Sequence, residues 1–338
     1  MDEENILITK ILRKENLQEA ADILLRGDTL IFPTETVYGL GARFDSDEAL
    51  QKVFRAKGRP ADNPLILHVA NASWVEQLAQ DIPPQAFELM EAFWPGPLSL
   101  VLKKKDHVSS LISAGLSSVA VRCPSHELAH QLIQAVGLPV AAPSANPSGR
   151  PSPTREIDVM EMVGKVAGIL LGGDCEVGLE STVLDLSTDV PLVLRPGAVT
   201  TQQLRRFLPD VRRYEGDPEG APSPGLRHRH YAPDAQVTML RGSDRALKTF
   251  IASAPKTSCF LLPSRLDIAF DGVRTIAFTP QGLLEEAAAR LYALLRDADK
   301  AGMKEIYIAE FPLEGIGEAL MDRVLRAAQY NILTLEEI

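Results

Sequence analysis

The chain has 338 residues, of which 45% are hydrophobic and 24% are charged. This composition is typical of a folded protein with a substantial core, and the length favours two domains. The formal net charge of −10 argues against a general nucleic-acid binder, because such proteins neutralise phosphates with an excess of Lys and Arg. No apolar run approaches the length of a membrane span.

The cysteines and the N-terminal residues indicate the cellular compartment in which the protein resides. Cys123, Cys175 and Cys259 are scattered and form no CxxC pair, which indicates reduced thiols and argues against a Cys-rich zinc site. The opening "MDEENILITK" is acidic and lacks the apolar core of a signal peptide. We therefore expect a cytoplasmic protein.

Residues 1–212 are predicted to form a mixed α/β domain. Two stretches, "SDEALQKVFRAKG" and "SHELAHQLIQAVG", show helical spacing of apolar residues, and Gly58 can end the first of them. About eight strands and six helices give one compact domain with a mixed, twisted sheet. The predicted strands are "TLIF", "PLILHV", "LSLVLK", "SSVAVRC", "PVAAPS", "AGILLGG", "STVLDLS" and "PLVLRP".

Residues 213–235, "RYEGDPEGAPSPGLRHRHYAPDA", are predicted to link two domains. The segment holds four Pro and three Gly, has no periodicity and is too long for an ordinary loop. Its "RHRHY" group could attract phosphates and place an aromatic ring over a pocket, as a lid does. The two histidines could instead be a metal pair, but no Cys or third His lies nearby in the sequence.

Residues 236–338 alternate β and α patterns, which predicts a small Rossmann-like parallel sheet. Strands are expected at "QVTMLRG", "SCFLLPS", "VRTIAFT" and "EIYIAEFP", and helices at "DRALKTFIAS", "LLEEAAARLYALLRDADKAG" and "GEALMDRVLRAAQ". The first strand is followed by no GxGxxG, so a dinucleotide site is not expected.

Polar side chains gather at the ends of the strands in the first domain. They are Thr34, Glu35, Thr36, Tyr38, Lys57, Arg59, His68, Arg122, Ser144, Asn146, Ser148, Ser181, Thr182 and Arg195.

Each of these residues also has an ordinary structural explanation. Thr34 could bond its own backbone in a turn, and Glu35 could only cap backbone amides. Lys57 and Arg59 could be a solvated helix end favoured by the helix dipole. His68 on an apolar strand could be a core histidine.

Cationic residues and donor-rich loops occur together at several places in the sequence, and this favours a binding site over separate structural explanations. Cations sit at four separate places in an otherwise acidic chain: Lys57 with Arg59, Arg122, Arg195, and the linker. Loops rich in Ser and Gly lie between them and offer N–H and hydroxyl donors. Ligands of α/β sheets bind at strand ends, and this combination suits a polyphosphate. No GxxxxGK[ST] is present, so a P-loop is excluded.

Seven motifs, taken together and in order, resemble the YrdC-type L-threonylcarbamoyladenylate synthases. They are "FPTETVYGLG", "KGRPxxNPLILHV", "WPGPLSLVL", "VAVRCP", "AAPSANPSG", "ESTVLDL" and "LRPGAV". The "SPGLRHRHYAP" linker and the tail resemble the long, two-domain form of that family. The resemblance implies that L-threonine, bicarbonate (or CO₂) and ATP give threonylcarbamoyl-AMP and pyrophosphate. It also implies that a partner transferase then modifies N6 of adenosine 37 in tRNA.

The resemblance also implies roles for individual residues. L-threonine would be held by Thr34, His68, Arg122 and Ser181. ATP would be held by Lys57, Arg59, Ser118, Ser144, Asn146, Ser152 and Arg195, and from the linker by Arg229 and Tyr231. Of these, Lys57, Arg59 and Arg195 would act in catalysis by stabilising phosphoryl charge. Magnesium would arrive with ATP, and no protein ligand for it is named.

Two other hypotheses remain open at this point. The first domain could be an RNA-binding module that uses its cationic pocket, although residues 1–205 hold 18 basic against 26 acidic residues. The tail could serve only to recruit partners, which is compatible with an enzyme complete in residues 1–205. No tight nucleic-acid binding and no membrane association are expected.

Overall fold

The computed structural model describes residues 7–215, 231–266 and 274–336. The chain divides into two compact units. The N-terminal unit comprises Met1–Ser148, Ser152–Glu176 and Glu180–His228, and the C-terminal unit comprises Gly149–Pro151, Val177–Leu179 and Arg229–Ile338. Among the described residues, no helix is both long enough and apolar enough to cross a bilayer.

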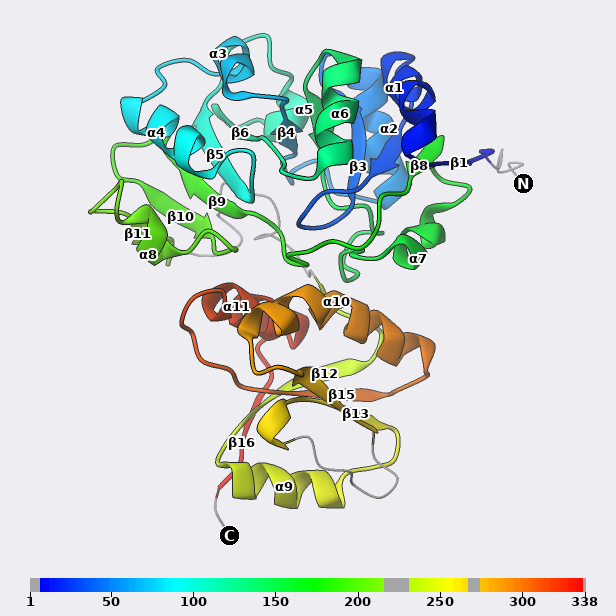
Figure 1. Cartoon of the computed structure of the whole chain (residues 1–338), viewed down its shortest axis with the longest axis vertical. Helices are drawn as coiled ribbons and strands as arrows, with labels where there is room; N and C mark the ends of the chain where they lie inside the picture. Colours follow the sequence, from blue (N-terminus) through cyan, green and yellow to red (C-terminus); the bar gives the residue numbers. More distant parts are fainter. Residues whose placement is uncertain (1–6, 216–230, 267–273, 337–338) are drawn as a thin grey trace. The chain divides into compact units, whose positions relative to one another are not determined.

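The N-terminal unit is built on an eleven-stranded mixed sheet with the order β1-β8-β2-β3-β7-β4-β6-β5-β9-β10-β11 (Figure 1). The strands are β1 (Lys10–Leu12), β2 (Leu30–Phe32), β3 (Gly39–Arg43), β4 (Ile66–His68), β5 (Leu98–Lys103), β6 (Ser118–Arg122), β7 (Val140–Ala142), β8 (Gly168–Leu170), β9 (Thr182–Asp185), β10 (Leu192–Arg195) and β11 (Arg212–Arg213). The α-helices are α1 (Leu17–Leu25), α2 (Asp47–Lys57), α3 (Val75–Leu78), α4 (Pro84–Phe93), α5 (Ser110–Ser113), α6 (Glu127–Val136), α7 (Glu156–Val159) and α8 (Thr201–Leu204).

In helix α2, the local sequence determines where the helix begins, where it ends and which face is buried. The Ser46 hydroxyl accepts a hydrogen bond from the Ala49 N–H (3.3 Å) at its start, as an N-cap does. Gly58 ends the helix with φ of 60°, a conformation that glycine adopts without strain. Its predicted apolar face is buried, with Leu50 and Val53 fully covered.

Strand β2 is buried on both faces because residues from each side of the sheet pack against it. Leu30 and Phe32 belong to a cluster with α1 and α6, whereas Ile31 packs with Val53 of α2. The continuous apolar run "TLIF" is what such a strand requires. The polar turn that follows β2 therefore starts from a rigid position in the core.

The segment after this turn is a strand that does not appear among the strands predicted from the sequence. Gly39 and Gly41 of the "GLG" stretch lie in strand β3, antiparallel to β2. A Cβ on Gly41 would lie 2.8 Å from both Phe32 Cε1 and Val140 Cγ1. The glycines therefore make room for the core, and their low strand propensity hid the strand in the sequence.

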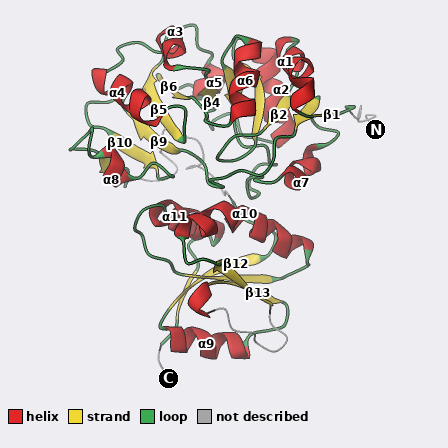
Figure 2. Cartoon of the chain, viewed as in Figure 1, coloured by secondary structure: helices red, strands yellow, loops and turns green. Residues whose placement is uncertain are grey.

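The C-terminal unit has a five-stranded, all-parallel sheet with the order β14-β13-β15-β12-β16. Helices α10 and α11 lie on one face and α9 on the other (Figures 1 and 2). The elements are β12 (Gln236–Arg241), α9 (Asp244–Ser253), β13 (Ser258–Pro263), β14 (Arg274–Thr279), α10 (Leu284–Lys300), β15 (Glu305–Ala309), α11 (Gly317–Ala327) and β16 (Ile332–Thr334). The predicted parallel α/β tail is confirmed, and β16 is the strand that the sequence analysis missed.

Candidate active site

The turn Pro33–Tyr38 joins β2 to β3 and is buried throughout. The Thr34 hydroxyl accepts hydrogen bonds from the N–H groups of Thr36 and Val37 (both 3.2 Å) and donates to the Val37 carbonyl (2.6 Å). This is the backbone-bonding role that Thr commonly has in turns. The Thr34 side chain therefore fixes the shape of the turn.

Arg122, the last residue of β6, is the buried cation beside this turn. It is 3% exposed. Its Nε donates to the Gly96 carbonyl (3.3 Å) and its Nη1 to the Thr36 hydroxyl (2.8 Å). Its Nη2 lies 2.7 Å from Oε2 of Glu35. A buried guanidinium with donors still to satisfy is suited to binding a carboxylate.

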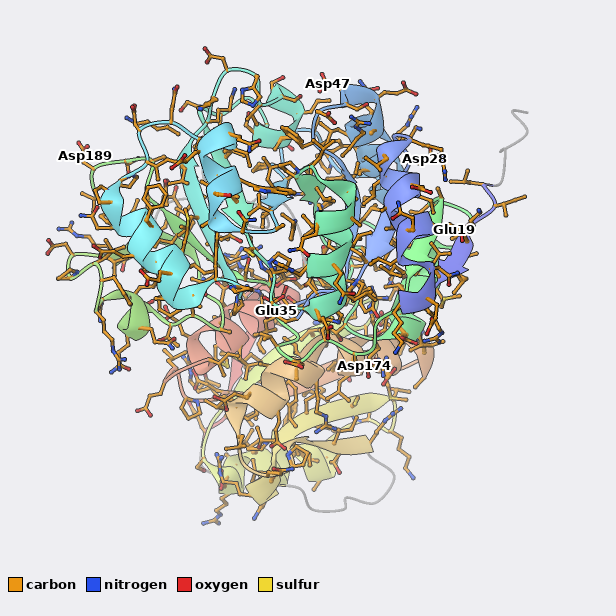
Figure 3. The ribbon with its side chains drawn as sticks, turned by 45° about the horizontal axis from the view of Figure 1, so that its top comes forward. Glu19, Asp28, Glu35, Asp47, Asp174 and Asp189 are labelled. Carbon is orange, nitrogen blue, oxygen red and sulfur yellow. The ribbon has the colours of Figure 1, made fainter. Side chains whose placement is uncertain are left out.

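Glu35 is the counter-ion of Arg122 and is 4% exposed. Burial by itself raises the pKa of Glu35, but the charge of Arg122, together with nearby backbone N–H groups, lowers the pKa to below its usual range. The carboxylate is therefore ionised at neutral pH. In Figure 3, Glu35 lies in the interior of the N-terminal unit, whereas Asp28, Asp47 and Asp189 lie at its periphery. A cavity of about 740 Å³ borders Glu35, Ser125, His126 and Gly172.

His68 pairs with Arg122 across the parallel strands β4 and β6. Its Nδ1 contacts the Ile66 carbonyl (3.2 Å), and its ring meets Phe32 edge-on at 5.8 Å. Burial, and then the Arg122 charge, lower the pKa of His68 to about 3. His68 is therefore neutral and packed into the core, where it lies opposite Arg122 on the neighbouring strand.

Ser181 and Arg195 form a second polar group. The Ser181 hydroxyl lies 2.8 Å from that of Ser99. Arg195 donates from Nε to the Ser181 carbonyl (3.1 Å) and from Nη2 to the Ser181 hydroxyl (3.2 Å). Next to them, the Ser152 hydroxyl donates to Glu180 (2.6 Å). All of these side chains are buried.

Lys57 and Arg59 lie at and after the end of α2. Lys57 is 4% exposed, and its Nζ donates to the carbonyls of Ser144 and Asn146. Arg59 donates to the carbonyls of Asn63 (3.1 Å) and Pro64 (2.9 Å). Lys57 is therefore not the solvated helix end that its sequence position also allowed, because its ammonium group is bound to the serine-rich loop.

Backbone hydrogen bonds join these groups through the Pro33–Tyr38 turn. The Tyr38 N–H donates to the Pro153 carbonyl (3.0 Å), and the Ala145 N–H donates to the Tyr38 carbonyl (2.8 Å). The Tyr38 hydroxyl donates to the Gly173 carbonyl (2.7 Å). The turn thus connects the loop that Lys57 holds, the Ser152 loop and the Arg122 site.

Three predicted residues are not part of this group: one begins the strand that Arg122 ends, one belongs to the C-terminal unit, and one lies outside the described residues. Ser118 begins β6 while Arg122 ends it, so about 13 Å of strand separates them. Tyr231 is buried in the C-terminal unit, where it stacks on Tyr292 at 5.5 Å and Arg323 lies over its ring. Arg229 falls outside the described residues.

The sequence analysis missed the partners of the predicted residues. Glu35 was considered only as a backbone cap, and Thr36 and Ser99 were given no role. The available signal was an acidic residue three positions after the apolar run "TLIF", since a carboxylate buried at the end of a core strand needs a counter-charge. The histidines of "RHRH" lie outside the described residues. Within the described ranges, no group of three His, Cys, Asp or Glu side chains is placed to hold a metal ion.

Comparison with known proteins identifies the family to which the chain belongs. Residues 22–197 match the Sua5/YciO/YrdC family, described as telomere recombination, and residues 199–329 match the C-terminal domain of threonylcarbamoyl-AMP synthase. The chain therefore belongs to the threonylcarbamoyl-AMP synthase family, in its two-domain form, which confirms the resemblance seen in the sequence. Its relatives are nucleotidyl-transferring enzymes, so the chain is an enzyme that uses ATP.

Individual relatives match over nearly the full length. Threonylcarbamoyl-AMP synthase of Bacillus subtilis is 40% identical, with 94% of each chain covered. That of Pyrococcus abyssi is 38% identical, with 97% of this chain and 98% of the relative covered. The crystal structure of P. abyssi Sua5 complexed with L-threonine matches with a TM-score of 0.90 and 37% identity, covering 97% of this chain and all of that one.

The low pKa of His68 predicts an acid-sensitive stability. Below about pH 6.5 the unfolded chain takes up a proton at His68 and the folded chain does not, so the free energy of unfolding should fall by up to about 1.4 kcal/mol per pH unit. Urea unfolding at about pH 7.5 and about pH 5 should therefore show a steeper loss for the wild type than for His68→Asn. Parallel losses in the two proteins would contradict a neutral, buried His68.

Proposed function

We propose that this enzyme converts L-threonine, bicarbonate (or CO₂) and ATP into threonylcarbamoyl-AMP and pyrophosphate. The observation that supports it best is the buried Arg122, which sits beside a rigid polar turn with donors available for a carboxylate. The 40% identity to a named threonylcarbamoyl-AMP synthase over 94% of both chains supports the same reaction. The RNA-binding alternative is not favoured by these relatives.

The mechanism needs no covalent enzyme intermediate. The threonine amine and bicarbonate give an N-carboxylate and water. An oxygen of the N-carboxylate then attacks the α-phosphorus of ATP and displaces pyrophosphate. Arg122 binds the threonine carboxylate, with Thr34, His68 and Ser181 around it. The contribution of the protein is then to position the reactants and to stabilise charge.

The cations are proposed to act on the nucleotide. Lys57, Arg59 and Arg195 stabilise the negative charge on the α-phosphoryl group and the leaving pyrophosphate. Hydroxyl and amide groups hold the rest of ATP, from Ser118, Ser144, Asn146 and Ser152. Magnesium enters with ATP as part of the substrate and keeps several of its waters.

We also propose which step follows the reaction, where in the cell it takes place and which part of the chain carries it out. The product is a labile mixed anhydride, so a transferase must accept it promptly and move the threonylcarbamoyl group to adenosine 37 of tRNA. The enzyme would act in the cytoplasm, where that tRNA is available. Residues 1–212 form the catalytic domain, residues 213–235 the linker with Arg229 and Tyr231 acting on the nucleotide, and residues 236–338 the C-terminal domain.

The reaction itself is the first prediction of this proposal. Pyrophosphate release from ATP should require both L-threonine and bicarbonate, and mass spectrometry should detect threonylcarbamoyl-AMP. The control is the same mixture with L-threonine left out. Release that proceeds without threonine, or products ending in ADP and phosphate, would exclude the proposed reaction.

Arg122→Lys tests the carboxylate site. Lysine keeps the charge but loses the two-pronged donor, so threonine affinity should fall about 10- to 100-fold, as expected for a charged hydrogen bond of about 1.5–3 kcal/mol. ATP affinity should change much less. Arg241→Lys is the matched control, since Arg241 pairs with Glu310 at the surface of the C-terminal unit. Calorimetry showing unchanged threonine binding in Arg122→Lys would refute the assignment.

The linker prediction concerns Tyr231. If its ring closes over the nucleotide, Tyr231→Ala or deletion of residues 222–233 should lower turnover strongly while the first domain stays folded. Tyr231→Phe keeps the ring and serves as the control. ATP with threonine should also slow tryptic cleavage at Arg227 and Arg229. Equal cleavage with and without ligands, together with full activity of the deletion variant, would reduce the segment to a tether.

A further inference from the structure

The plane of the Arg122 guanidinium is set by contacts other than its ion pair. Nε donates to the carbonyl of Gly96, before β5, and Nη1 donates to the hydroxyl of Thr36, in the turn after β2. These two acceptors come from separate segments of the chain, and Gly96 and Thr36 are both buried. The orientation of Arg122 is therefore determined without Glu35.

Glu35 supplies the charge that neutralises Arg122. Its Oε2 is 2.7 Å from Nη2 of Arg122. Against the effect of burial, which raises the pKa of Glu35, this pairing, together with nearby backbone N–H groups, lowers the pKa and keeps the carboxyl ionised. The other two guanidinium nitrogens donate to Gly96 and Thr36. Glu35 therefore contributes its charge at one nitrogen, whereas the Gly96 and Thr36 acceptors set the orientation of Arg122.

We infer that Glu35 is a positioning residue that acts through Arg122 and sets how tightly the site holds the threonine carboxylate. The inference rests on the proposed function, because it takes threonine as the ligand of Arg122. An incoming carboxylate meets an ion pair of zero net charge, so the attraction of Arg122 is opposed by the neighbouring charge of Glu35.

The weaker attraction of Arg122 for the threonine carboxylate affects product release. Threonylcarbamoyl-AMP keeps the free carboxylate of its threonine, since the new bonds form at the amine and at the phosphorus. The contact that binds the substrate therefore also holds the product. A residue that limits the strength of this contact lets the product leave at a useful rate.

The test removes the charge of Glu35 and keeps its size. In Glu35→Gln, we expect KM and the calorimetric Kd for L-threonine to fall about tenfold, kcat to fall as product release slows, and KM for ATP to stay within about twofold. Glu35→Asp keeps the charge and should lie nearer to the wild type in both constants. Structural damage would instead raise KM for threonine while lowering kcat, so the paired change separates the two causes.

Threonine binding by the two Glu35 variants can also contradict the inference. A higher or unchanged threonine Kd in folded Glu35→Gln, or an Asp variant that matches the Gln variant, would overturn the inference. If Glu35→Gln does not fold, the Asp variant still tests it, because a threonine Kd raised tenfold or more there would show that Glu35 holds the geometry of Arg122. Failure of the proposed function itself is recognised separately, since wild-type protein would then bind no threonine.

Discussion

The contact between Arg122 and Glu35 is the constraint on which the rest of the site depends. A guanidinium that is 3% exposed keeps its charge in the core, and Glu35 at 2.7 Å provides the counter-ion that offsets the cost of burying it. Glu35 can reach that position only because the Pro33–Tyr38 turn is itself buried and fixed by the Thr34 hydroxyl. The shape of one short turn thus decides whether the sheet can carry a buried cation at the end of β6.

The same turn organises the polar groups around it. Tyr38 bonds to the backbone at Pro153 and Ala145, on the two sides of the serine-rich loop that Lys57 grips through carbonyls. Strand β3 follows the turn at once, and Gly41 lets it lie against Phe32. Core packing and the site are therefore not separable here: a bulkier residue in β3 would displace the turn that positions Glu35.

Much of the fold could be predicted from the sequence, because apolar runs such as "TLIF" and capped patterns such as Asp47–Lys57 are local signals. Strand β3 could not, because its glycines satisfy a packing demand made by Phe32 and Val140. Arg122 and Lys57 stood out as cations in an acidic chain. Their partners did not, since Glu35 and Arg122 are separated by 86 intervening residues and no local pattern encodes such a pairing. The stacking of Tyr231 on Tyr292 was hidden for the same reason.

The central claim is that Arg122 receives the carboxylate of L-threonine. The most direct measurement is calorimetric binding of L-threonine and of L-threonine amide, which has the same side chain and amine but no carboxylate, to the unmodified protein. The account predicts that the amide binds at least about tenfold more weakly, as loss of a hydrogen bond to a charged group requires. Equal affinity for the two ligands would contradict it.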